Sequence, residues 1–173
     1  MSPEEVRLRS LYLFQACSHA VNEFKNRLLT TFPAQPLTST LMLDRSLTRE
    51  LGMLFRYWTT RQIWDQLEDA EADAKNLNLA LLRLFTDGFK LPKDGSGLKY
   101  AELSSPSEEV QELGQRMTAA LGMEHQPLLD ALHAGIVGWR DEVTRQTKEA
   151  LELPIIQLSS LVKAQAEEAT GET

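Results

Sequence analysis

Apolar residues recur every three or four positions along most of the chain, a spacing that places them on one side of an α-helix. Alternating runs of Val, Ile and Thr, which are typical of strands, do not occur in the sequence. The first apolar run follows Pro3, with Ser2 as its N-cap, and should end before Pro33. Its apolar positions are Val6, Leu13, Cys17, Ala20, Phe24 and Leu28.

A second helix is expected over residues 44–86, either continuous or in two pieces. Its first apolar positions share one side, but at about 100° per residue Ile63 falls on the opposite side. This change of phase near Thr59 and Thr60 indicates a kink, a break or burial on two sides. The first set is Leu47, Leu51, Leu54 and Trp58, and the second is Ile63, Leu67, Ala70, Ala74, Leu77, Leu81 and Leu84.

Glycine, proline and capping residues mark the next boundaries. Residues 87–106 contain three glycines and two prolines, and they are expected to form a loop of about twenty residues, a length that is commonly functional or mobile. Ser105 and Glu108 have the spacing of a capping box, so the following helix should begin there and end at Gly122.

Two further helices are expected in the last third of the chain. Pro127 opens one, Pro154 ends or kinks it, and a short last helix leads into a frayed tail over about residues 166–173. Together these patterns predict an all-α fold. We expect a single helical domain over residues 1–173, built as an antiparallel bundle of five to six helices with one long loop.

Charge is unevenly distributed within a net charge of −7. Residues 1–62 hold eight Lys and Arg against five Asp and Glu, whereas residues 63–173 hold ten against twenty. Such an acidic body disfavours free binding to a polyanion but leaves a local contact through the first third open. The candidate interaction residues are Arg45, Arg49 and Arg56, which share one helical side, and the loop lysines Lys90, Lys93 and Lys99.

The stretch WDQLEDAEADAK, residues 64–75, contains five carboxylates. Helical phase places most of them opposite the apolar side, as is typical of a solvated face. The alternative is a Mg²⁺ site, because magnesium prefers oxygen ligands and binds one or two carboxylates together with substrate phosphates. Acidic residues three positions apart, which suit such a site in an all-α hydrolase, are Glu68 with Glu71 and Glu109 with Glu112.

Other chemistry is sparse. The single cysteine, Cys17, excludes an internal disulfide and lies on the apolar side of its helix, so it should be a buried thiol, and His19 points elsewhere. The sequence has no phosphate-binding glycine motif or coherent catalytic set, so we expect no cofactor and favour a protein that is not an enzyme. It also has no secretion signal or membrane-spanning run, which leads us to expect an acidic cytoplasmic protein that does not enter membranes.

Three functional hypotheses follow. The first is a non-catalytic helical interaction module that works by protein–protein interaction, as a small complex subunit or a homodimer. The second is a small helical subunit of a nucleoprotein complex, which contacts the nucleic-acid backbone through its arginine stripe only within that complex. The third is a Mg²⁺-dependent nucleotide hydrolase of the all-α kind that uses the four paired glutamates.

Overall fold

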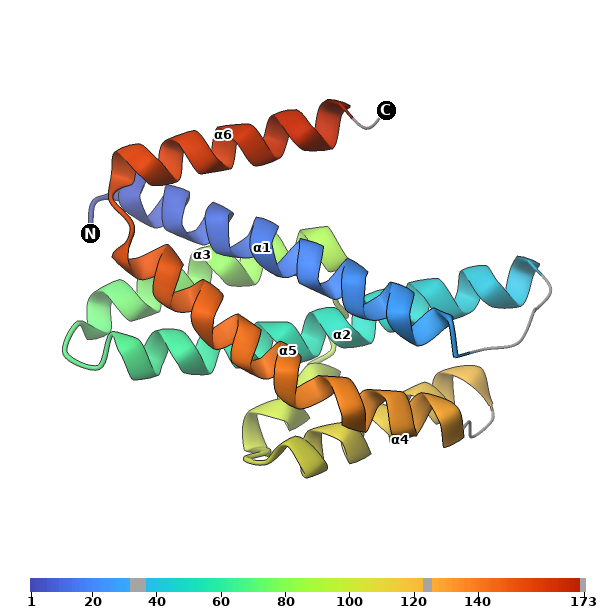
Figure 1. Ribbon diagram of the computed structural model, residues 1–173. Coiled ribbons are helices and arrows are strands. Elements are labelled where there is room, and N and C mark those ends of the chain that lie inside the picture. Colours follow the sequence, from blue (N-terminus) through green and yellow to red (C-terminus); the bar gives the residue numbers. More distant parts are fainter. Residues whose placement is uncertain (32–36, 123–125, 172–173) are drawn as a thin grey trace.

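A computed structural model describes residues 1–31, 37–122 and 126–171 of the chain, and this part is all-helical, as predicted. The first three helices pack against one another, and α5 and α6 both pack against α1, which lies between them (Figure 1). The elements are α1 (Pro3–Leu29), α2 (Leu37–Gln66), α3 (Glu71–Phe89), the 3₁₀ helix η1 (Ser96–Glu102), α4 (Pro106–Leu121), α5 (Gln126–Glu152) and α6 (Ile155–Gly171).

Several helix ends lie where their capping residues predicted them. The Ser2 hydroxyl accepts the backbone N–H of Glu5 at 3.1 Å at the start of α1. Ser105 does the same for Glu108 at 3.2 Å at the start of α4, and Gly122, with φ of 72°, ends that helix. The helical conformation is interrupted at Pro154, between α5 and α6, so this proline separates two helices and does not merely kink one.

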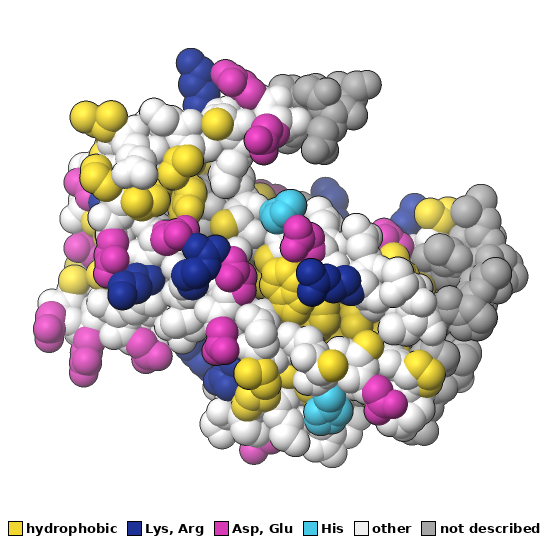
Figure 2. Space-filling model, viewed as in Figure 1, with side chains coloured by type: hydrophobic (Ala, Val, Ile, Leu, Met, Phe, Trp, Pro, Cys, Tyr) yellow, Lys and Arg dark blue, Asp and Glu magenta, His cyan; other side chains and the backbone are white. Residues whose placement is uncertain are grey.

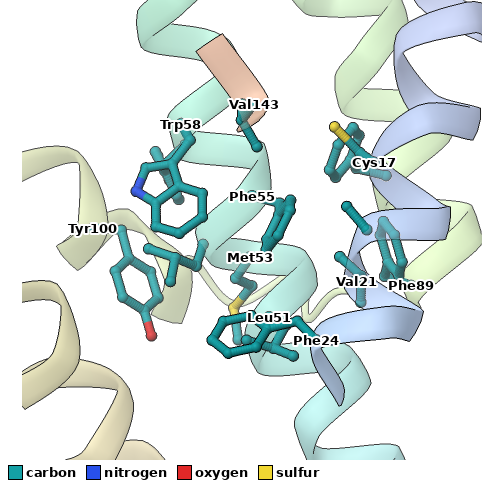
Figure 3. Packing of buried hydrophobic residues seen from close by; sticks show 14 of the residues in the cluster. Cys17, Val21, Phe24, Leu51, Met53, Phe55, Trp58, Phe89, Tyr100 and Val143 are labelled. Carbon is teal, nitrogen blue, oxygen red and sulfur yellow. The ribbon is translucent and has the colours of Figure 1, made fainter. Parts of the chain in front are cut away.

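The central helix is α2, which contacts α1, α3, α4, α5 and η1. Figure 3 shows its buried side chains pointing both ways, with Trp58 next to Tyr100 on one side and Phe55 directed towards α1 on the other. Thr59 is buried and α2 continues through it, so the predicted change of phase reflects burial on two sides and not a break at that point.

The second predicted helix is in two pieces, which the sequence left open, but its boundaries are wrong at three places. The helix begins at Leu37, not near residue 44. The stretch PAQPLTST, residues 33–40, which the sequence suggested as a connector, is therefore helical from Leu37 on, and residues 33–36 lie outside the described residues. The chain turns over residues 67–70, where the backbone N–H of Ala70 donates to the carbonyl oxygen of Leu67 at 2.9 Å. The second piece, α3, then continues past residue 86 to Phe89.

The predicted loop over residues 87–106 is largely folded. Its first residues belong to α3, and η1 packs against α2 because Tyr100 is buried there. Arg61 of α2 fixes this segment by donating to the carbonyl oxygen of Tyr100 at 2.6 Å. The expected frayed tail is also helical as far as Gly171.

The helices also bear on the question of membranes. Within the described ranges, none of them has both the length and the apolarity that crossing a bilayer requires.

Candidate functional site

The candidate site is a cleft of about 530 Å³ between the first half of α2 and the end of α3. It brings together three of the six predicted interaction residues, although Lys90 follows the two arginines by about forty positions in the sequence. We call it the basic cleft; its lining residues are Met42, Asp44, Arg45, Ser46, Thr48, Arg49, Gly88, Phe89 and Lys90.

Two glycines allow the helices to form this cleft. A β-carbon on Gly52 of α2 would lie 2.7 Å from Cγ of Phe89, so only glycine lets the Phe89 ring lie directly on the α2 backbone. A β-carbon on Gly88 would overlap the ring of Phe14 in α1. The end of α3 is therefore held against both α1 and α2, which fixes the floor of the cleft.

Lys90 stands at the rim because of how α3 ends. Its backbone is left-handed, with φ of 55°, and its N–H donates to the carbonyl oxygen of Thr86. The next N–H, that of Leu91, also donates to Thr86 at 3.1 Å, and the Leu91 side chain is buried. The chain is thus anchored on both sides of the bend, with the exposed Lys90 at the cleft's edge.

The cleft has an excess of positive charge. Its one carboxylate, on Asp44, is already paired with the ammonium of Lys25, since Oδ1 and Nζ are 3.0 Å apart. Within the part of the chain that the structure describes, Arg49 forms an ion pair only with the buried Glu50, at 3.9 Å, and is 46% exposed. Among the described residues, Arg45 and Lys90 have no ion-pair partner. Three cations therefore face solvent around this cleft with one neutralised acid between them.

The floor and the rim suit different parts of a ligand. The exposed Met42 offers apolar surface beside the buried Phe89, whereas the two arginines and the lysine offer N–H donors that carry positive charge. The arrangement suits a group that combines an anion, a carboxylate or a phosphate, with an apolar side chain or ring.

The other three predicted interaction residues lie elsewhere. Phe89 covers Gly52, which lies between Arg49 and Arg56 on the same side of α2, so the predicted arginine stripe is divided. Arg56 is half-buried, with its guanidinium 5.0 Å from the centre of the Tyr57 ring. The two remaining lysines are exposed beyond the end of α3 and outside the cleft; they are Lys93 and Lys99.

The four glutamates of the alternative metal site are not brought together. Glu68 and Glu71 are exposed at the turn between α2 and α3, whereas Glu109 is buried on α4. Glu112 pairs with Arg116 at 3.1 Å. Within the described residues, no group of three or more acidic, histidine or cysteine side chains is placed to hold a metal ion.

Glu109 instead belongs to a buried polar cluster that the sequence did not predict. Its carboxylate accepts the indole N–H of Trp58 at 2.8 Å and lies 3.7 Å from the guanidinium of Arg140 and 3.8 Å from that of Arg61. Burial raises the pKa of Glu109, and these three donors partly oppose that effect. The cluster ties α4 to α2 and α5.

A second buried acid, Glu50, also pairs with an arginine of a neighbouring helix. Glu50 of α2 lies 3.7 Å from Arg116 of α4, whose guanidinium also lies 5.0 Å from the centre of the Tyr100 ring. Burial raises the pKa of Glu50, and Arg116 opposes this most strongly. The only sequence signal for the burial of Glu50 is its position. It follows Leu47 by three residues and precedes Leu54 by four, which places it beside the leucine side of α2.

The remaining chemical candidates are separate from the cleft and from each other. Cys17 is fully buried and donates its thiol to Oε1 of Gln146 at 3.7 Å. His19 is exposed and lies 2.9 Å from Glu23 of the same helix. The predicted buried thiol is confirmed.

Comparison with known proteins identifies no relative of the chain. No protein family model, no curated protein and no solved structure matches the chain.

Proposed function

We propose that the chain is a non-catalytic helical interaction module that binds an acidic segment of a protein partner in the basic cleft. The observation that carries this proposal is the gathering of Arg45, Arg49 and Lys90 around the apolar floor, while Lys25 neutralises the one carboxylate.

The residues around the cleft favour binding over catalysis. No histidine or cysteine is among its lining residues, and its carboxylate is engaged in an ion pair. The hydroxyl of Thr48 donates to the backbone carbonyl of Asp44 at 2.9 Å, so it is held by its own helix. The cleft thus offers donors and apolar contact but no activated nucleophile or general base.

A protein ligand fits the cleft better than a nucleic acid does. Carboxylates next to apolar side chains match both the rim and the floor, whereas a nucleic-acid backbone would use only the rim. The net charge of −7 also opposes the approach of a long polyanion. A subunit of a nucleoprotein complex is the second candidate, because arginine and lysine bind phosphate as readily as carboxylate.

Fluorescence anisotropy with defined probes tests the proposal. One probe is a labelled peptide that carries several Asp and Glu residues around one Trp, a second is the same peptide with Asn and Gln in their place, and a third is a labelled oligothymidylate. We expect the acidic peptide to bind more tightly than the amide peptide, and added salt to weaken its binding. R45E/R49E should abolish this binding, and K93E/K99E, with the same change of charge outside the cleft, should reduce it only slightly.

The alternative outcomes are distinct. Binding of oligothymidylate but not of the acidic peptide, with the same loss in R45E/R49E, would favour the nucleoprotein subunit. Equal losses in R45E/R49E and K93E/K99E would show that net charge, and not the cleft, governs binding, and would contradict the proposal.

A further inference from the structure

The chain carries, at the other end of α2, a surface that complements the basic cleft. The turn between α2 and α3 is lined by exposed carboxylates, which gather at one end of the molecule in Figure 2. Beside them Trp64 is 41% exposed, an unusual position for so large an apolar side chain. We call this surface the acidic tip; its residues are Trp64, Asp65, Glu68, Asp69 and Glu71.

The acids of this tip are available for an outside partner. Among the described residues, none of the four makes an ion pair, in contrast to Asp73 on the next turn, which binds the N-terminal ammonium at 2.9 Å. The tip therefore combines unneutralised carboxylates with one exposed aromatic ring. These are the two features that the cations and the apolar floor of the basic cleft would recognise.

The tip and the cleft of one molecule cannot meet. The cleft residues of α2 end at Arg49 and the tip begins at Trp64, so at 1.5 Å per residue the two surfaces are about 20 Å or more apart along this helix. Contact between them requires two molecules. Because the two surfaces differ, each molecule that docks its tip still presents a free cleft, and each that offers its cleft still presents a free tip.

We propose that the acidic tip of one copy docks in the basic cleft of the next, so that copies of the chain associate head to tail. Trp64 would lie on the floor formed by Met42 and Phe89, and the surrounding carboxylates would pair with Arg45, Arg49 and Lys90. This inference rests on the proposed function, because it identifies the acidic partner of the cleft as a second copy. Such a contact is small, so association should be weak and sensitive to salt.

The full chain is tested by sedimentation velocity over a range of concentrations. The average mass should rise continuously past twice the 19.5 kDa of the chain and should fall when salt is added. A cleft variant, R45Q/R49Q/K90Q, and a tip variant, D65N/E68Q/D69N/E71Q, should each remain monomeric alone. Mixed in equal amounts, they should form one-to-one heterodimers and nothing larger, since each supplies the surface that the other lacks.

A control variant and a second kind of measurement test whether the effects are specific to the tip and the cleft. E102Q/D141N/E152Q removes three exposed acids outside the tip and should assemble as the wild-type chain does. Circular dichroism must show that the cleft and tip variants keep their helical content. Tryptophan fluorescence gives an independent signal, because docking would bury Trp64, and W64A should weaken assembly several-fold while leaving the charges in place.

Several outcomes would overturn the inference. They are a wild-type chain that stays monomeric at every concentration, a mass that stops at the dimer in the wild type and in the cleft variant alike, and a mixture of variants that does not combine. If the chain stays monomeric but the acidic peptide still binds the cleft, self-association is wrong and the proposed function stands. If neither binds, both are wrong.

Discussion

Phe89 lies on the backbone of Gly52 so closely that a β-carbon there would be 2.7 Å from its Cγ and 2.8 Å from its Cβ. The contact is with the base of a buried side chain, which cannot simply rotate away. We expect Gly52→Ala to lower the free energy of unfolding by about 1–2 kcal/mol, because the cost of overpacking exceeds the gain in helix propensity. Urea-induced unfolding measures this difference.

The same substitution at a helical glycine in open space provides the control. A β-carbon on Gly138 of α5 would meet nothing within 4 Å. Gly138→Ala should therefore stabilise the protein by about 0.5–1 kcal/mol. Stabilisation by Gly52→Ala of similar size would show that α3 is not packed on α2 in this way.

The hydrogen bond between Trp58 and Glu109 gives a second prediction. Glu109→Ala leaves a buried indole N–H without an acceptor and removes the partner of two guanidiniums, so it should destabilise the protein by about 3 kcal/mol. Glu109→Gln keeps an acceptor for Trp58 and should cost about 1 kcal/mol, because Arg61 and Arg140 are 28% and 31% exposed and remain partly solvated. Equal losses in the two variants, measured in urea, would contradict this ranking.

The helices follow from the sequence because each apolar run has helical spacing and several boundaries carry capping residues. The turn over residues 67–70 was not predicted because it contains neither Gly nor Pro, and Leu67 and Ala70 continue the apolar pattern through it. The fold of the loop was missed for a related reason. Its glycines and prolines suggested irregular structure, whereas the burial of Tyr100 orders η1 against α2.

The candidate site was only half predictable. The spacing of Arg45 and Arg49 places both on one side of a helix, but no local pattern brings Lys90 to them. That depends on the close packing of α3 on Gly52, which is a tertiary contact. The burial of Glu50 and Glu109 could not be predicted from the sequence either. Charges on helices are usually solvated, so a buried acid is recognised only when its partners from other helices are known.

The pH dependence of stability should have opposite signs for two glutamates. Burial raises the pKa of Glu50, so its contribution is full below the ordinary glutamate pKa and is lost as pH rises through the raised value. The stability of Glu50→Gln relative to the wild type should therefore increase as pH rises from about 4, the ordinary glutamate pKa, towards neutral. Hydrogen bonds from Arg145 lower the pKa of Glu142, so its contribution is lost as pH falls through the lowered value.

The stability of Glu142→Gln should accordingly fall furthest below that of the wild type at neutral pH, and the difference should shrink as the pH is lowered. Urea midpoints of the two variants and the wild type, measured across this pH range, give both trends. Parallel curves for the two variants would show that the environments of these carboxyls do not differ as described.

The rate at which Cys17 is modified measures how readily the core opens. Its side chain is fully buried between α1 and α5, and burial raises the pKa of the thiol, so both access and thiolate formation are suppressed in the folded chain. Ellman's reagent should modify it at least about 1000-fold more slowly than in the unfolded chain, since core opening costs about 5 kcal/mol or more. The rate should rise as urea is added below the unfolding midpoint. Rapid labelling without urea would show instead that α1 and α5 separate locally at little cost.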